Sequence, residues 1–87
     1  MSMGASQNAL STSAEVVLAA NQHRVFAEIK NTDASISVYI GPDSGVTSSN
    51  GHLLKAGEAF SFENMPDAVY MIAASGTPTV TIIEWSR

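Results

Sequence analysis

The amino-acid sequence predicts an all-β fold: a small antiparallel β-sandwich with jelly-roll-like or Ig-like Greek-key connectivity. Short runs rich in Val, Ile, Phe and Tyr recur at intervals of about 8–12 residues, separated by turns of Asn, Asp, Gly, Ser and Pro, which is typical of sandwiches and barrels. Apolar and polar residues alternate along several of these runs. Such alternation indicates strands with one buried face, and no stripe with helical spacing persists.

The first two predicted strands follow a polar beginning of the chain. Residues 15–18 form a short apolar run. In the next run, Val25, Ala27 and Ile29 share one face, because side chains alternate along a strand. Phe26 therefore lies on the opposite face, away from the core.

A turn is predicted at residues 31–35, because Asn and Asp tolerate left-handed backbone and bond to their own main chain. The alternation then resumes, so that Val38 faces the core and Tyr39 points away from it. We therefore predict a hairpin over residues 24–40. A long polar loop follows at residues 41–51.

Three further apolar segments follow this loop. Leu53 and Leu54 are expected to fill one end of the sandwich. Phe60 and Phe62 are two positions apart and therefore share one face of the next strand. Another strand is predicted over residues 69–74.

The last predicted strand, residues 79–85, is apolar on both faces. Val80 and Ile82 face one way, whereas Ile83 and Trp85 face the other. A two-layer sandwich buries only one face of each sheet, so something must cover the second face. Exposed aromatic patches tend to mark contact sites. The candidate oligomer interface consists of Phe26, Tyr39, Ile83 and Trp85; alternatively, the N-terminal segment folds back over this face.

The predicted domain organisation is a flexible N-terminal arm, residues 1–13, followed by a single β-sandwich domain, residues 14–87. The arm is mostly Ser, Ala, Gly, Gln and Asn, with Leu10 as its one Leu. Such a segment is too polar to pack a core, so it either frays or becomes ordered on a partner. A chain of 87 residues has a small core, and self-association is expected to add stability.

Composition argues against several classes of partner and site. The net charge is −4 and the four basic residues are scattered, so no basic face is available for nucleic acid. No apolar run approaches the roughly 20 residues that cross a bilayer. The beginning of the chain does not resemble a signal peptide, which predicts synthesis and folding in a cytoplasm. Without cysteine there is no disulfide framework.

No motif points to catalysis or to a bound metal. His23 and His52 each stand alone in a turn, and Asp33, Asp43 and Asp67 are isolated loop carboxylates. The sequence has no nucleophile elbow, no zinc signature and no phosphate-binding glycine loop. We therefore predict a non-enzymatic protein with no catalytic residue, no metal site and no cofactor.

Several short segments resemble a type of small β-sandwich protein that tailed bacteriophages encode among their structural genes. They are Arg24-Val25-x-x-x-Ile29-x-Asn31, Val38-Tyr39-Ile40-Gly41, Val46-Thr47-Ser48-Ser49-Asn50-Gly51, Leu54-x-Ala56-Gly57-Glu58 and Tyr70-x-Ile72-Ala73-Ala74-Ser75-Gly76. The similarity covers about residues 21–85, and its motifs are turn and core positions. The resemblance implies a virion component: a capsid decoration or head-fibre-like protein, or a small domain of a tail structure.

The predicted function is therefore that of a capsid decoration or cement protein, which assembles as an oligomer on the capsid surface and stabilises the head. Its expected partners are its own copies and the major capsid protein. A trimer is favoured because capsid lattices present local three-fold positions. The arm and an end loop supply the candidate capsid-attachment residues, which are Leu10, Ser44 and Val46.

Two alternatives stay open. In the first, the chain is a tail- or fibre-associated module that displays residues 44–50 to a host surface. In the second, it is a small carbohydrate-binding module. Sugar binding uses exposed aromatic platforms, and against this reading Tyr39, Tyr70 and Trp85 are few and dispersed along the chain.

Overall fold

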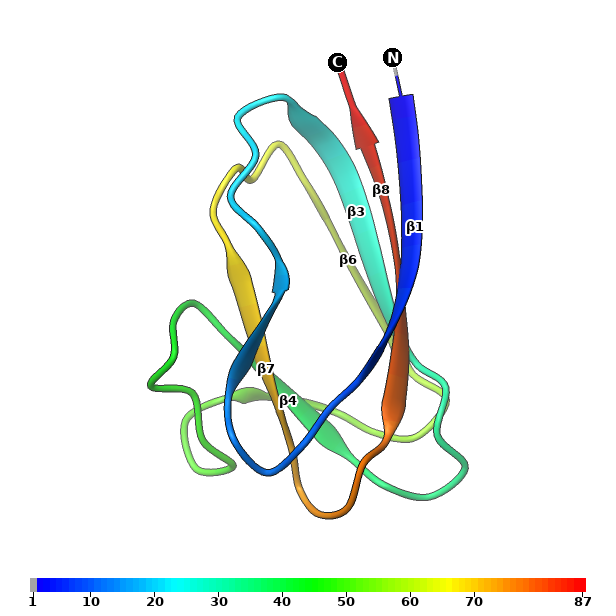
Figure 1. Ribbon diagram of the computed structural model, residues 1–87, viewed down its shortest axis with the longest axis vertical. Coiled ribbons are helices and arrows are strands. Elements are labelled where there is room, and N and C mark those ends of the chain that lie inside the picture. Colours follow the sequence, from blue (N-terminus) through cyan, green and yellow to red (C-terminus); the bar gives the residue numbers. More distant parts are fainter. Residues whose placement is uncertain (1) are drawn as a thin grey trace.

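The computed structural model describes residues 2–87, which form eight β-strands and no helix (Figure 1). In chain order the strands are β1 (Ser2–Ala9), β2 (Glu15–Leu18), β3 (Arg24–Asn31), β4 (Val38–Gly41), β5 (His52–Leu54), β6 (Ala59–Glu63), β7 (Val69–Ala73) and β8 (Thr79–Ser86). Over this range, no helix could cross a membrane.

The strands form two four-stranded antiparallel sheets. The first sheet has the order β1-β8-β3-β6, and the second sheet has the order β2-β7-β4-β5. The pairs β1 with β8, β2 with β7, β3 with β6 and β4 with β5 are nested. The chain is thus one long antiparallel ribbon folded on itself, with strands distributed between two sheets. This is jelly-roll connectivity. The predicted all-β sandwich is confirmed, and of its two proposed connectivities the jelly roll is the one observed.

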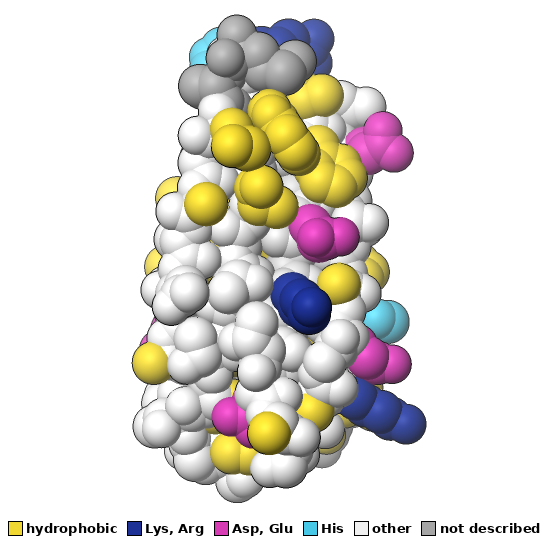
Figure 2. All heavy atoms as spheres, turned by 90° about the vertical axis from the view of Figure 1, so that its right-hand side faces the viewer, with side chains coloured by type: hydrophobic (Ala, Val, Ile, Leu, Met, Phe, Trp, Pro, Cys, Tyr) yellow, Lys and Arg dark blue, Asp and Glu magenta, His cyan; other side chains and the backbone are white. Residues whose placement is uncertain are grey.

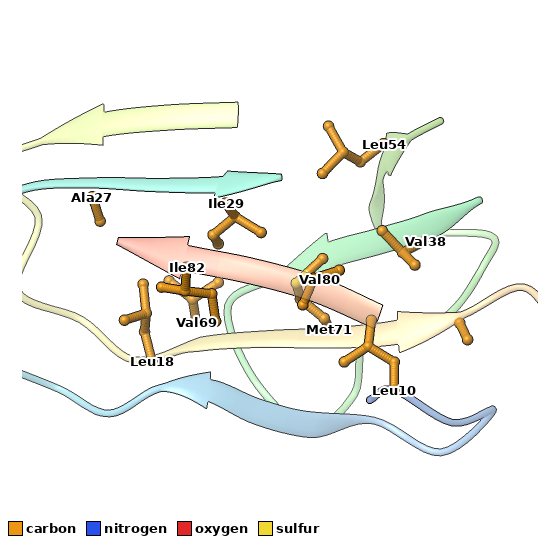
Figure 3. Packing of buried hydrophobic residues seen from close by; sticks show 11 residues of the cluster. Leu10, Leu18, Ala27, Ile29, Val38, Leu54, Val69, Met71, Val80 and Ile82 are labelled. Atoms are coloured by element: carbon orange, nitrogen blue, oxygen red, sulfur yellow. The ribbon is translucent and has the colours of Figure 1, made fainter. Parts of the chain in front are cut away.

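The hydrophobic core lies between the two sheets (Figure 3). The first sheet supplies Ala27, Ile29, Val80 and Ile82, and the second sheet supplies Leu18, Val38, Leu54, Val69, Met71 and Ala73. The remaining buried member of the cluster, Leu10, follows directly after β1. Each of these side chains is on the inward face of its strand or at a strand end, as the period of two requires.

The predicted hairpin over residues 24–40 is wrong, because β3 and β4 belong to different sheets. Residues 32–37 cross from the first sheet to the second. The predicted faces are correct for Ala27 and Val38, which are buried, and for Phe26, which is only partly buried. Val25 was expected on the core face but is outside the core cluster, because the register of β3 shifts between Arg24 and Phe26. Side-chain alternation is the same in a hairpin and in a crossover, so the pattern alone could not distinguish them.

Asn31 holds this crossover in place. Its side chain is 0% exposed, and its Nδ2 donates hydrogen bonds to the Ile36 carbonyl at 2.8 Å and the Leu54 carbonyl at 3.1 Å. A buried amide with satisfied partners avoids the cost of desolvation and links β3 to β5. The next residues form a tight turn in which the backbone N–H groups of Ser35 and Ile36 donate to the Asp33 carboxylate. These bonds lower the pKa of Asp33.

The structure also corrects the predicted flexible arm, residues 1–13. Ser2–Ala9 form β1, and all eight of these residues pair with β8. Leu10 is 1% exposed and its N–H donates to the Pro78 carbonyl at 2.8 Å. Backbone pairing needs no apolar side chains, so a polar segment can form an edge strand. Met1 lies outside the described residues.

The predictions for residues 53–62 are confirmed in part. Leu54 is buried and fills the end of the core, whereas Leu53 is 41% exposed and does not. Phe60 and Phe62 share one face of β6, as predicted, and their ring centroids are 5.9 Å apart. Both rings pack against the core cluster without being fully buried.

Arg24 is an unexpected buried charge at the start of β3, with only 2% of its surface exposed. Its Nε donates to Glu84 Oε2 at 2.9 Å, and its Nη1 donates to the Met65 and Asp67 carbonyls at 3.0 and 2.9 Å. Its Nη2 donates to the Ala19 carbonyl. One guanidinium group therefore joins β3, β8 and two loops at one end of the sandwich.

The loop after β4 folds back over its own strand at two glycines. A β-carbon on Gly41 would lie 2.5 Å from Val46 Cβ, and one on Gly51 would lie 2.7 Å from Tyr39 Cβ. Real β-carbons do not approach other heavy atoms this closely. The absence of side chains at these two positions is thus what lets Val46 become buried.

The variant Gly41→Ala is expected to lower the free energy of unfolding by about 1–3 kcal/mol, because overpacking forces Val46 to move. Urea unfolding followed by the fluorescence of the single tryptophan measures the change. Gly4→Ala is the matched control, since its nearest contact would be 4.0 Å away. Equal midpoints for both variants would show that the loop can shift without cost.

Candidate interaction surface

The outer face of the first sheet changes from apolar to polar along its strands. The register of the sheet places residues of β1, β8 and β3 side by side in rows across this face. Paired residues of antiparallel strands point to the same side. The rows are Met3, Trp85 and Phe26; then Ala5, Ile83 and Glu28; then Gln7, Thr81 and Lys30.

The apolar half of this face forms a patch, here called the apolar patch, which consists of Met3, Ala5, Phe26, Ile83 and Trp85. Hydrophobic side chains gather in the upper part of the surface shown in Figure 2. The rings of Phe26 and Trp85 contact each other with centroids 5.7 Å apart and planes tilted by 54°. Met3 is 59% exposed. The patch thus combines a fixed aromatic pair with a flexible thioether side chain at its edge.

The neighbouring part of the face is a shallow groove. It has a volume of about 350 Å³ and begins at Ala5 and Ile83 of the apolar patch. Its polar lining residues include Gln7, Glu28, Lys30 and Thr81. Both charge signs and two neutral hydrogen-bonding groups therefore border the apolar patch. An apolar centre with a polar rim is the usual anatomy of a protein–protein interface.

The structure brings together three of the four predicted interface residues. Phe26, Ile83 and Trp85 lie in the apolar patch, but Tyr39 lies on β4 in the second sheet, where it pairs with Ile72 and Leu53. Tyr39 is therefore not part of the patch. Its assignment followed from alternation, which gives the face of a strand but not the sheet to which the strand belongs.

Met3 and Ala5 belong to the apolar patch but not to the predicted interface, because the polar composition of residues 1–13 predicts an arm. A signal was present: Met3 and Ala5 alternate with Gly4 and Ser6, which is the period of a strand. The signal is weak, since both of these side chains stand among small polar residues that favour no single structure.

The candidate attachment residues are only partly at the surface. Leu10 and Val46 are buried, with 1% and 4% of their surfaces exposed. This corrects their placement on an attachment surface, because buried side chains contact the protein's own core. Ser44 is exposed in the loop after β4. The neighbouring Gly45 N–H donates to Asp43 Oδ1 at 2.8 Å, which shapes the loop at this point.

The titratable side chains are dispersed. Among residues 2–87, no three His, Cys, Asp or Glu residues lie close enough together to hold a metal ion. His52 contacts Phe60 with ring centroids 5.2 Å apart. The carboxylates of Asp33 and Glu84 bind backbone N–H groups and Arg24, respectively. The outer face of the first sheet can therefore bind a partner through apolar contact and hydrogen bonds.

Comparisons with known proteins identify the fold. No family model and no curated protein matches the chain. Among solved structures, the spike protein P1 of bacteriophage PM2, in a crystal structure of its stem and receptor binding domain, superimposes with a TM-score of 0.67. The two sequences are 20% identical, and the match covers 87% of this chain but only 30% of the spike chain.

Two further structures have the same architecture. A designed double-stranded β-helix gives a TM-score of 0.55 at 16% identity and covers 98% of this chain and 100% of its own. The chain has a double-stranded β-helix fold. A cupin protein from Bacteroides fragilis gives a TM-score of 0.61 at 13% identity over 99% of this chain and 67% of that one. At these identities the shared feature is the double-stranded β-helix itself.

Proposed function

We propose that this chain is a non-enzymatic structural protein of a bacteriophage particle, which decorates the capsid surface as a homo-oligomer. The observation that carries the proposal is the apolar patch on an otherwise complete sandwich. Aromatic side chains held in a flat, polar-rimmed face are typical of sites that bind other proteins. The likeness to a phage spike domain and the resemblance of the sequence motifs to phage structural proteins support a place on the particle.

The residues of the apolar patch are placed to bind another subunit and not to fill the core of their own. Val80 and Ile82 already fill the core from the inner face of β8, so Ile83 and Trp85 add nothing to it. Covering them against another subunit removes apolar surface from water without repacking the sandwich. A trimer, matching a local three-fold position of a capsid, is the assembly we propose.

Replacing Trp85 by Ala is expected to weaken self-association by about 2 kcal/mol or more, which is roughly 30-fold in the dissociation constant. Sedimentation across a concentration series measures the loss, and circular dichroism checks that the β-structure is retained. Thr81→Ala is the matched control, since Thr81 lies on the same strand and face but outside the apolar patch. Loss of the folded monomer in Trp85→Ala would place this side chain in the stabilising core instead.

Purified phage particles, from the strain that carries the gene, test whether this chain is on the capsid. Mass spectrometry and electron microscopy are expected to find this chain on the head, in numbers comparable to the major capsid protein. Finding it in a few copies at the tail would favour a second function, contact with the host surface. The specific observation that favours this second candidate is the fold shared with part of the phage PM2 spike chain, whose structure contains a stem and a receptor binding domain. Absence from purified particles would contradict both.

A further inference from the structure

The outer edge of β1 is an open side of the first sheet. β1 is the terminal strand of the order β1-β8-β3-β6, and its eight residues pair with β8 without a shift of register. Every second backbone N–H and C=O group of such a strand points away from its neighbour. Within residues 2–87, the hydrogen bonds of the β1 backbone all go to β8. The groups on the other side therefore have no partner among the residues that the structure describes.

The other three sheet edges carry features that discourage pairing with another strand. β2 has four residues and an irregular register between Val16 and Leu18, and β5 has three residues. β6 has five residues and ends in Glu63. Short strands, bulges and charges are the means by which proteins protect sheet edges. β1 has none of them: it is eight residues long, regular and free of charge and proline.

The composition of β1 suits a second copy of itself as the partner. Pairing two identical strands places like residues near one another, which is unfavourable where they are charged. The segment SMGASQNA contains no charged residue, so self-pairing meets no such repulsion. Its side chains from Met3 to Gln7 are exposed, so no other part of the chain must move aside. Met3 and Ala5 also belong to the apolar patch, which pairing would extend across two molecules.

We propose that β1 pairs antiparallel with β1 of a second copy, about a two-fold axis perpendicular to the sheet, to form one continuous eight-stranded sheet. Such an isologous contact satisfies the open edges of both molecules at once. Odd-numbered residues of β1 face outward together with Trp85 and Ile83. Directly opposed residues must share a face, so the numbers of two paired residues sum to an even value. The overlap of the two strands is greatest when their middle residues are opposed, so the axis passes between the two copies of Ala5 or between the two copies of Ser6. This contact requires no other phage protein and is separate from the proposed role on the capsid.

Single-cysteine variants test the pairing directly, because the chain has no cysteine of its own. A residue on the axis meets its own copy at a Cα separation of about 4.5–5.5 Å, which a disulfide can bridge. Under mild oxidation at about 10 μM, either Ala5→Cys or Ser6→Cys is expected to form a covalent dimer roughly 100-fold faster than unpaired thiols, since pairing gives millimolar effective concentrations. Ser61→Cys, on the opposite edge strand β6, is the control. Equal rates for all three variants would overturn the proposal.

Hydrogen exchange of the unmodified chain supplies a second measurement. At high concentration, alternate amides of β1 that point away from β8 are expected to be protected, and dilution is expected to remove this protection. The amides bonded to β8 should be insensitive to dilution, which separates edge pairing from folding. Exchange independent of concentration would overturn the proposal. Protection that appears only when another phage protein is added would overturn it too, because the edge would then receive a strand of different sequence.

Discussion

Replacing Arg24 by Met is expected to lower the free energy of unfolding by several kcal/mol, because each buried acceptor that loses its donor costs about 1–3 kcal/mol. The variant keeps an unbranched side chain but removes every donor. Glu84 loses its ion pair, and the carbonyls of Ala19, Met65 and Asp67 lose the guanidinium that binds them. A domain of this size has only about 5–15 kcal/mol of stability in total.

Urea unfolding followed by tryptophan fluorescence measures this effect. Lys30→Met is the control, because Lys30 is exposed on the outer face of β3, and surface changes there usually stay within about 0.5 kcal/mol. Arg24→Lys is expected to recover little, since an ammonium cannot reproduce the planar fork that reaches four acceptors. A stability of Arg24→Met equal to that of Lys30→Met would mean that water replaces the guanidinium at no cost.

Replacing Leu10 by Ala is expected to lower the free energy of unfolding by about 2–5 kcal/mol, the range for large-to-small changes in a packed core. Leu10 is 1% exposed and belongs to the core cluster, although it follows a strand whose side chains are mostly exposed. The expected loss arises from the lost transfer energy of the side chain and from the cavity left behind. Leu10 thus anchors the end of β1 to the sandwich.

Thermal or urea unfolding compares Leu10→Ala with Leu53→Ala, in which the replaced side chain is 41% exposed. The exposed control is expected to change stability much less. Removing residues 1–13 takes away both a strand and this core side chain, so the truncated chain is expected to unfold rather than simply lose a binding arm. A Leu10→Ala variant as stable as the Leu53→Ala control would show that β1 adds little to folding.

The sequence by itself determined the fold class and the faces of the strands. In β8 the alternation of Val80 and Ile82 with Ile83 and Trp85 identified an inner and an outer apolar face, and the structure has both. The same argument placed Phe26 on the outer face. These features are local: they depend on the period of two along a single strand, which the order of residues contains.

Tertiary structure alone decided which strands are neighbours. Residues 24–40 have the pattern of a hairpin but cross between sheets, because the buried amide of Asn31 binds carbonyls in a loop and in β5. The polar segment before Leu10 forms β1 because its backbone pairs with β8, at the far end of the described chain.

The burial of Arg24 is likewise not visible in the sequence, because its acceptors include the carbonyls of Met65 and Asp67 and the carboxylate of Glu84, which are far along the chain. Each of these cases depends on contacts between residues far apart in the chain, and no local pattern of side chains encodes such partners.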